Sequence, residues 1–121
     1  MRKEMSLAGV FLLLTIPALA GEVDVIDLQF KAQGDHSYRF DVTLEHADTG
    51  WDHYANKWDV VAPDGKVFGT RTLYHPHVDE QPFTRSLSDV IIPASITEVS
   101  VRTHDLVHGY GGETVTVAVP K

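Results

Sequence analysis

The chain has 121 residues, no cysteine and a formal net charge of −7 at pH 7. This acidic balance excludes a protein built to bind nucleic acid or anionic lipid, and it favours cations or basic partners. Because cysteine is absent, disulfides, thiolate metal sites and blue-copper sites are excluded, and a packed core must supply the stability.

The first twenty residues have the pattern of a secretory signal peptide. A positively charged start, MRKEM, precedes the apolar run SLAGVFLLLTIPALA, which ends in small residues. This pattern predicts cleavage before Gly21, and the run is too short and too interrupted by proline to span a membrane. No cysteine follows it, so no lipoprotein anchor is expected. We expect a signal peptide over residues 1–20 and a periplasmic or secreted single domain over residues 21–121.

The next part of the chain has apolar residues at every second position, which predicts β-strands. In the first predicted strand, residues 26–32, Ile26, Leu28 and Phe30 share one side. In the second, residues 37–46, the sequence SYRFDVTLEH alternates in the same way. The glycine and aspartate between them indicate a hairpin turn.

The third and fourth predicted strands, residues 54–62 and 66–74, flank the sequence Pro-Asp-Gly at 63–65. Proline presets φ for a turn and glycine accepts a positive φ, so this is a strong turn signal. Trp58 in the third strand is expected in the core, whereas Trp51 in a polar loop is expected at the surface.

Three further strands are predicted over residues 83–92, 97–106 and 113–119. No segment keeps a helical period long enough to compete. Seven short strands in about one hundred residues predict an all-β fold, an immunoglobulin-like or fibronectin-like antiparallel β-sandwich. A different antiparallel barrel is the alternative.

The predicted strand order gathers the histidines at one end of the sandwich. If each strand reverses direction, the connections after the second, fourth and sixth strands share one pole, as in antibody domains. His36 falls at the opposite pole. The chain has seven histidines, and the other six fall on or beside these connections: His46, His53, His75, His77, His104 and His108.

Imidazole and carboxylate groups on such loops are ligands that zinc and copper(II) accept. In the sequence His-Pro-His an extended backbone directs both imidazoles to the same face. Three carboxylates are expected to hold an imidazole by its other nitrogen: Asp52, Asp105 and Glu80. The predicted ligand set is His75, His77, His104 and His108, with His53 and Asp79 in reserve.

The sequence therefore predicts an exported protein that binds a divalent transition metal, copper or zinc, at one loop pole. Histidine, aspartate and glycine are also ordinary loop residues, so a non-catalytic module that binds another protein through the same loops is an alternative. A small metal-dependent redox enzyme is a second alternative, because a bound metal can carry such chemistry. Ser86 and Ser88 belong to no recognisable nucleophile motif.

The run WDHYANKWDVVAPDGKVFGTRTLYHPHVDEQPFTRSL, residues 51–87, and the run VRTHDLVHGYGGE, residues 101–113, together carry a resemblance. They resemble an uncharacterised family of small exported β-sandwich proteins of Gram-negative bacteria that have no assigned activity. The resemblance covers most of the chain after the signal peptide. It implies export and does not imply a reaction.

Overall fold

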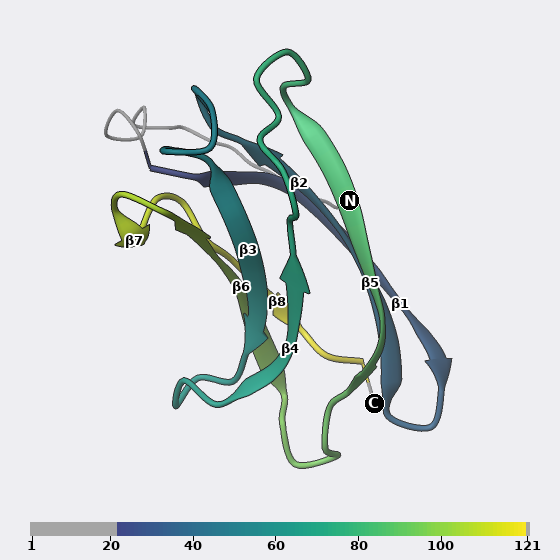
Figure 1. Cartoon of the computed structure of the whole chain (residues 1–121). Coiled ribbons are helices and arrows are strands. Elements are labelled where there is room, and N and C mark those ends of the chain that lie inside the picture. The colour runs from purple at the N-terminus through teal and green to yellow at the C-terminus, as the bar shows by residue number, and fades with distance from the viewer. Residues whose placement is uncertain (1–21, 121) are drawn as a thin grey trace.

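Two antiparallel β-sheets packed face to face make up the described part of the chain (Figure 1). The computed structural model describes residues 22–120. The predicted signal peptide, residues 1–20, and the cleavage point before Gly21 therefore lie outside the described residues.

The smaller sheet has three strands in the order β1-β2-β5, and the larger has the path β4-β3-β6-β7 with β8 also paired to β6. Every pairing is antiparallel. The strands are β1 (Asp24–Gly34), β2 (Ser37–Glu45), β3 (Ala55–Val61), β4 (Val67–Thr72), β5 (Phe83–Ile91), β6 (Glu98–Asp105), β7 (Gly109–Tyr110) and β8 (Val115–Ala118).

The predicted all-β sandwich is confirmed, and residues 22–120 contain no helix. All seven predicted strands are present, and the short strand β7 is an addition that the sequence did not predict. In a constant-type immunoglobulin domain the fourth strand joins the sheet of the first, second and fifth strands. Here β4 pairs with β3 instead, so it belongs to the larger sheet.

The core lies between the sheets and follows from the period of two. In β2 the side chains of Phe40, Val42 and Leu44 are each 0% exposed, and their neighbours in sequence face outward. Trp58 of β3 is fully buried, as predicted, whereas Trp51 is 66% exposed. Burial of each large apolar side chain stabilises the fold by about 1.5–3 kcal/mol.

The first strand departs from simple alternation at its start. A bulge between Val25 and Asp27 shifts the register, so that Val25 is 5% exposed whereas Ile26 is 49% exposed. Beyond the bulge Leu28 and Phe30 pack against the core as expected. The predicted side for Ile26 is therefore wrong, because one extra residue reverses the faces of the strand.

The predicted Pro-Asp-Gly turn is confirmed: the amide of Gly65 donates to the carbonyl of Ala62 at 2.9 Å, and Gly65 has a φ of 92°. In the β1–β2 hairpin the residue with positive φ is His36, at 60°. Asparagine, aspartate and histidine are the side chains that tolerate this region best.

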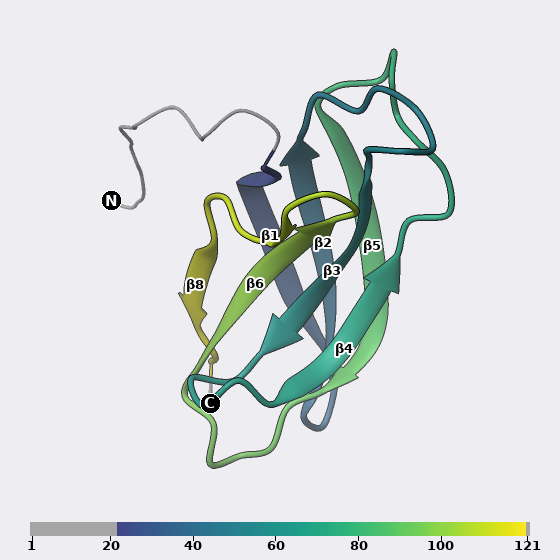
Figure 2. The same ribbon diagram turned by 60° about the vertical axis from the view of Figure 1, so that its left-hand side comes forward.

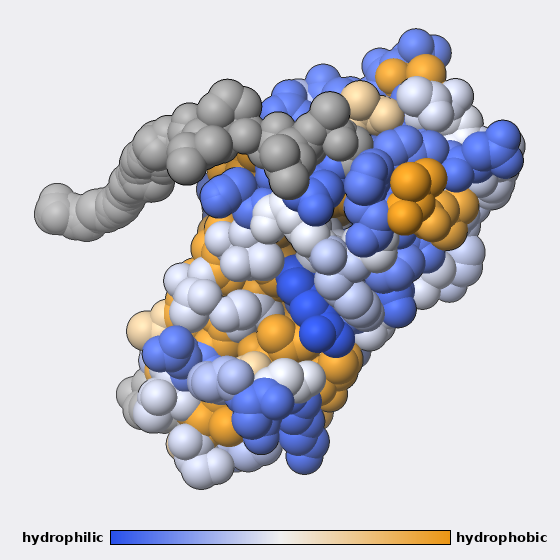
Figure 3. Space-filling model, turned by 90° about the vertical axis from the view of Figure 1, so that its left-hand side faces the viewer, coloured by the Kyte–Doolittle hydropathy of each residue, from blue (hydrophilic) through white to orange (hydrophobic). Residues whose placement is uncertain are grey.

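The outer face of the larger sheet is polar. Lys57 and Asp59 of β3, together with Arg102 and His104 of β6, lie on the side opposite the buried Trp58. Figure 3 views this side of the molecule, where strongly hydrophilic side chains cover the middle and hydrophobic patches lie beside them. In residues 22–120 we find no helix that is long and apolar enough to cross a membrane.

Figures 1 and 2 show that the β2–β3, β4–β5 and β6–β7 connections meet at one end of the sandwich, as predicted. The β1–β2, β3–β4 and β5–β6 connections lie at the opposite end, which also holds His36. We call the first end the histidine pole; its connections span residues 46–54, 73–82 and 106–108, and residues 111–114 follow β7.

Candidate metal centre

Strand alternation delivers one imidazole and one carboxylate to the inner side of the histidine pole. His46 follows Leu44 by two residues and continues the inward face of β2. Asp105 follows Thr103 by two residues on the inward face of β6. His46 is 3% exposed and Asp105 is 1% exposed. Strands β2 and β6 thus each lead to a buried group that could bind metal.

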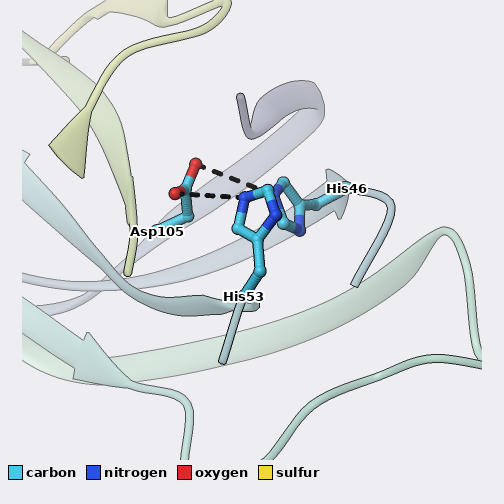
Figure 4. A group of neighbouring side chains, drawn as sticks. All are labelled: His46, His53 and Asp105. Carbon is cyan, nitrogen blue, oxygen red and sulfur yellow. Dashed lines mark ion pairs between the residues drawn. The ribbon is translucent and has the colours of Figure 1, made fainter. Parts of the chain in front are cut away.

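His53, from the β2–β3 connection, completes a cluster with these two residues. Figure 4 shows the three side chains pointing toward one another, and their ligand atoms all lie within 4.8 Å of one another. The distance from Nε2 of His46 to Oδ2 of Asp105 is 3.6 Å, and the distance from Nε2 of His53 to Oδ1 of Asp105 is 3.4 Å. Across residues 22–120 this is the one group of three or more such residues with this geometry.

The two distances to Asp105 match the spacing of ligands around one ion. Zinc binds nitrogen and oxygen at about 2.0–2.2 Å, so two of its tetrahedral ligands lie roughly 3.4 Å apart. Both contacts with Asp105 exceed the ordinary length of a hydrogen bond, about 2.7–3.2 Å. The two imidazoles are thus too far from Asp105 for ordinary hydrogen bonds, but they lie at the spacing of ligands that share one ion.

The cluster is closed toward the core and open toward solvent. The side chain of His46 is 0% exposed and that of Asp105 is 1% exposed. The side chain of His53 is 20% exposed, and that of His108 is 33% exposed. Since the ring of His108 lies 5.0 Å from that of His53, these two imidazoles form the solvent side of the cluster.

The turn between β6 and β7 fixes Asp105. Its Oδ1 accepts the backbone amides of Val107 at 2.8 Å and His108 at 2.7 Å, and Nδ1 of His108 lies 3.2 Å away. Burial raises the pKa of Asp105, but these amides and the charge of His108 outweigh it, so the pKa lies below its usual range. Asp105 is therefore an ionised carboxylate, the form that binds metal.

His75 and His77, predicted as ligands, lie together but outside this cluster, with ring centroids 4.6 Å apart. His77 is buried and stacks on Phe83 at 3.9 Å, and Nη2 of Arg85 lies 3.1 Å from its Nε2. Burial, followed by the charge of Arg85, lowers the pKa of His77. The Nδ1 atom of His75 lies 3.0 Å from the carbonyl oxygen of Pro76.

His104, also predicted as a ligand, faces away from the cluster because it alternates with Asp105 on β6. Its Nδ1 is 2.7 Å from Oδ1 of Asn56, and its ring meets the edge of Tyr110 at 4.8 Å. Burial, followed by the nearby charge of Lys57, lowers the pKa of His104.

The remaining predicted residues differ in their placement. His53 is a member of the cluster and His108 borders it. Asp79 and Asp52 are exposed, and Glu80 forms an ion pair with Arg85 at 3.2 Å. Asp105, predicted to orient an imidazole, is itself part of the cluster.

The prediction did not select His46 as a ligand or Asp48 as its partner. Asp48 is 5% exposed, and its carboxylate hydrogen-bonds Nδ1 of His46. The alternation of β2 contained the signal for His46, because it lies two residues beyond the last inward apolar residue. Asp48 lies beyond the strand, where alternation gives no guide.

In comparisons with known proteins, no family model matches the chain and no solved structure matches it. The chain is 42% identical over 96 residues to a protein of the archaeon Halomicrobium mukohataei that bears the name "Putative lipoprotein". The match covers 79% of this chain and 47% of that protein, so the chain spans about half the length of this relative. The relative is archaeal and gives no support to the predicted Gram-negative origin.

Proposed function

We propose that this protein is an exported metal-binding protein that holds one divalent transition-metal ion, zinc or copper(II), at the histidine pole. The ligands are His46, His53 and Asp105. The observation that carries the proposal is the convergence of two imidazoles and one ionised carboxylate within 4.8 Å at the end of the sandwich.

The donor set favours zinc and copper(II) among common metals. Two nitrogens and one oxygen without sulfur suit these ions, whereas copper(I) prefers thiolates and thioethers. Three protein ligands with one further position are also typical of reactive zinc sites. His108 is placed to fill that fourth position, since its Nδ1 lies 3.2 Å from Asp105 and its side chain is partly exposed.

The route for the ion is the open side of the cluster. His46 and Asp105 are covered by the sandwich, whereas His53 and His108 reach solvent. An ion enters between these two imidazoles and then meets the buried ligands. This arrangement suits an ion that is taken up and released, as in metal handling or delivery.

Export is the second element of the proposal. The apolar N-terminal run supports a periplasmic or secreted location, and the name of the archaeal relative, which contains the word lipoprotein, is compatible with an exported protein. A Gram-negative source remains a proposal that rests on the resemblance of residues 51–87 and 101–113.

One observation favours a second function, the binding of a protein partner. Trp51 is 66%, Leu106 46% and Val107 59% exposed. The ring of Trp51 contacts that of Tyr54 at 5.6 Å, and the amide of Leu106 donates to the carbonyl of Tyr54. This apolar surface flanks His53. A redox enzyme, the third function considered, would use the same open metal position, and metal-dependent turnover would identify it.

The test is a calorimetric titration of the metal-free protein with zinc and with copper(II). We expect one equivalent bound with submicromolar affinity, and a loss of more than about 100-fold in His46→Gln, because removal of a ligand costs more than removal of its outer hydrogen-bond partner. His75→Gln is the matched control and should bind like the wild type. Weak binding of several equivalents that His46→Gln leaves unchanged would refute the proposal.

A further inference from the structure

We propose that Asp48 is a positioning residue for the metal centre, which holds His46 with Nε2 directed at the ion. This inference rests on the proposed function. Asp48 itself is not a ligand, because its carboxylate contacts the far nitrogen of His46 and the backbone amides of Ala55 and His77.

Asp48 fixes the orientation of the His46 imidazole through Nδ1, the ring nitrogen that faces away from the cluster. Nδ1 of His46 donates a hydrogen bond to Oδ1 of Asp48. An ionised carboxylate can only accept, so the proton of this bond belongs to His46. In a neutral imidazole the lone pair is then on Nε2, the atom 3.6 Å from Asp105. A carboxylate behind a metal-binding histidine sets its tautomer and raises its basicity.

The carboxylate of Asp48 is itself held in place. Oδ1 also accepts the backbone amide of Ala55 at 3.1 Å, and Oδ2 accepts that of His77 at 2.7 Å. Ala55 begins β3 and His77 belongs to the β4–β5 connection, so Asp48 joins two of the three connections of the histidine pole. Its orientation therefore depends on the fold and not on the side chain of His46 alone.

The burial of Asp48 agrees with this role. The side chains of Asp48 and His46 are both 0% exposed. Water therefore does not compete for this contact, in which the carboxylate engages Nδ1 of His46 and leaves Nε2 toward the cluster.

Asparagine at this position keeps the volume and removes both the charge and one acceptor. If its amide nitrogen takes the place of Oδ1, it donates to Nδ1 of His46 and moves the imidazole proton to Nε2. If the nitrogen takes the place of Oδ2, it faces the backbone amide of His77, and these two hydrogen-bond donors repel each other. In both orientations the basicity of His46 falls.

The experiment compares zinc affinity in the full chain of the wild type, Asp48→Asn and the matched control Asp59→Asn. Asp59 is also buried, and it accepts hydrogen bonds from Thr70, Arg102 and Tyr110 on the outer face of the larger sheet. We expect Asp48→Asn to lose about 10- to 100-fold in affinity. Asp59→Asn should keep the wild-type affinity although it loses stability.

A second measurement gives a decisive result in the wild type alone. Long-range proton–nitrogen NMR of the wild-type imidazoles should find the His46 proton on Nδ1, and in Asp48→Asn the population protonated at Nε2 should rise. A proton on Nε2 alone in the wild type would overturn the inference, as would equal loss of affinity in both aspartate variants. If the wild type binds no zinc but His46 has the expected tautomer, the proposed function fails and the structural hold of Asp48 on His46 stands.

Discussion

Substitution of Asp105 by asparagine tests how one carboxylate serves both the turn after β6 and the metal centre. Asp105 accepts two backbone amides, from Val107 and His108. Hydrogen bonds to charged groups contribute about 1.5–3 kcal/mol and neutral ones about 0.5–1.5 kcal/mol. Asparagine can keep both bonds with a neutral oxygen, so we expect a loss of about 2 kcal/mol in the free energy of unfolding.

The same substitution should have a larger effect when zinc is present. A ligand at 100 times its dissociation constant stabilises the folded state by about 2.7 kcal/mol. In a domain of this size 1 kcal/mol shifts Tm by roughly 4–8 °C. The wild type should therefore gain about 10–20 °C at that zinc concentration, whereas Asp105→Asn, which lacks the one charged ligand of the cluster, should gain almost nothing.

The assay is thermal unfolding followed by circular dichroism, with and without zinc, at one protein concentration. Chelator added after the zinc should restore the metal-free Tm. The reasoning is refuted if zinc raises Tm equally in the wild type and in Asp105→Asn, or if the two proteins have equal stability without zinc.

Three further predictions concern residues outside the ligand set. His104→Gln should change zinc affinity by no more than about twofold, because its side chain lies on the outer face of β6 and its ring nitrogen contacts Asn56 instead of the ligand groups; a large loss by calorimetry would contradict the outward orientation of His104. Burial, followed by the charge of Arg85, lowers the pKa of His77 in the folded protein. As the pH falls below about 6.5, His77 is therefore protonated in the unfolded state before it is protonated in the folded state. Urea unfolding should therefore show stability falling as pH drops below that value, and falling less in His77→Gln; equal slopes would be the contrary result. At Gly112, φ is 81° and an added Cβ would lie 1.8 Å from the carbonyl oxygen of Val23, so Gly112→Ala should cost at least about 2 kcal/mol in the same assay, whereas Gly34→Ala, with open space around it, should cost far less.

The sequence predicts the fold well because alternation is a local property of each strand. Seven predicted strands and the grouping of their connections follow from the period of two and from turn residues such as Gly65. Ile26 is the exception, since a bulge reverses the faces of β1 without a glycine or proline to mark it. The short strand β7 depends on pairing with the end of β6, and two residues carry no periodicity.

The sequence predicts the pole of the candidate site but not the full ligand set. Loop histidines such as His75 attract attention by their spacing, whereas His46 and Asp105 belong to strand ends that alternation turns inward. The same alternation turns His104 outward, although it is the immediate neighbour of Asp105. The contact between Asp48 and the amide of His77 spans 29 positions in the sequence, and no local pattern predicts it.

The most direct test of the metal centre is a crystal structure of the zinc-soaked protein with anomalous diffraction measured at the zinc edge. We predict one strong anomalous peak at about 2.0–2.2 Å from Nε2 of His46, Nε2 of His53 and one oxygen of Asp105. A strong peak between His75 and His77, or no peak at the cluster under zinc concentrations that saturate the protein, would contradict the proposed centre.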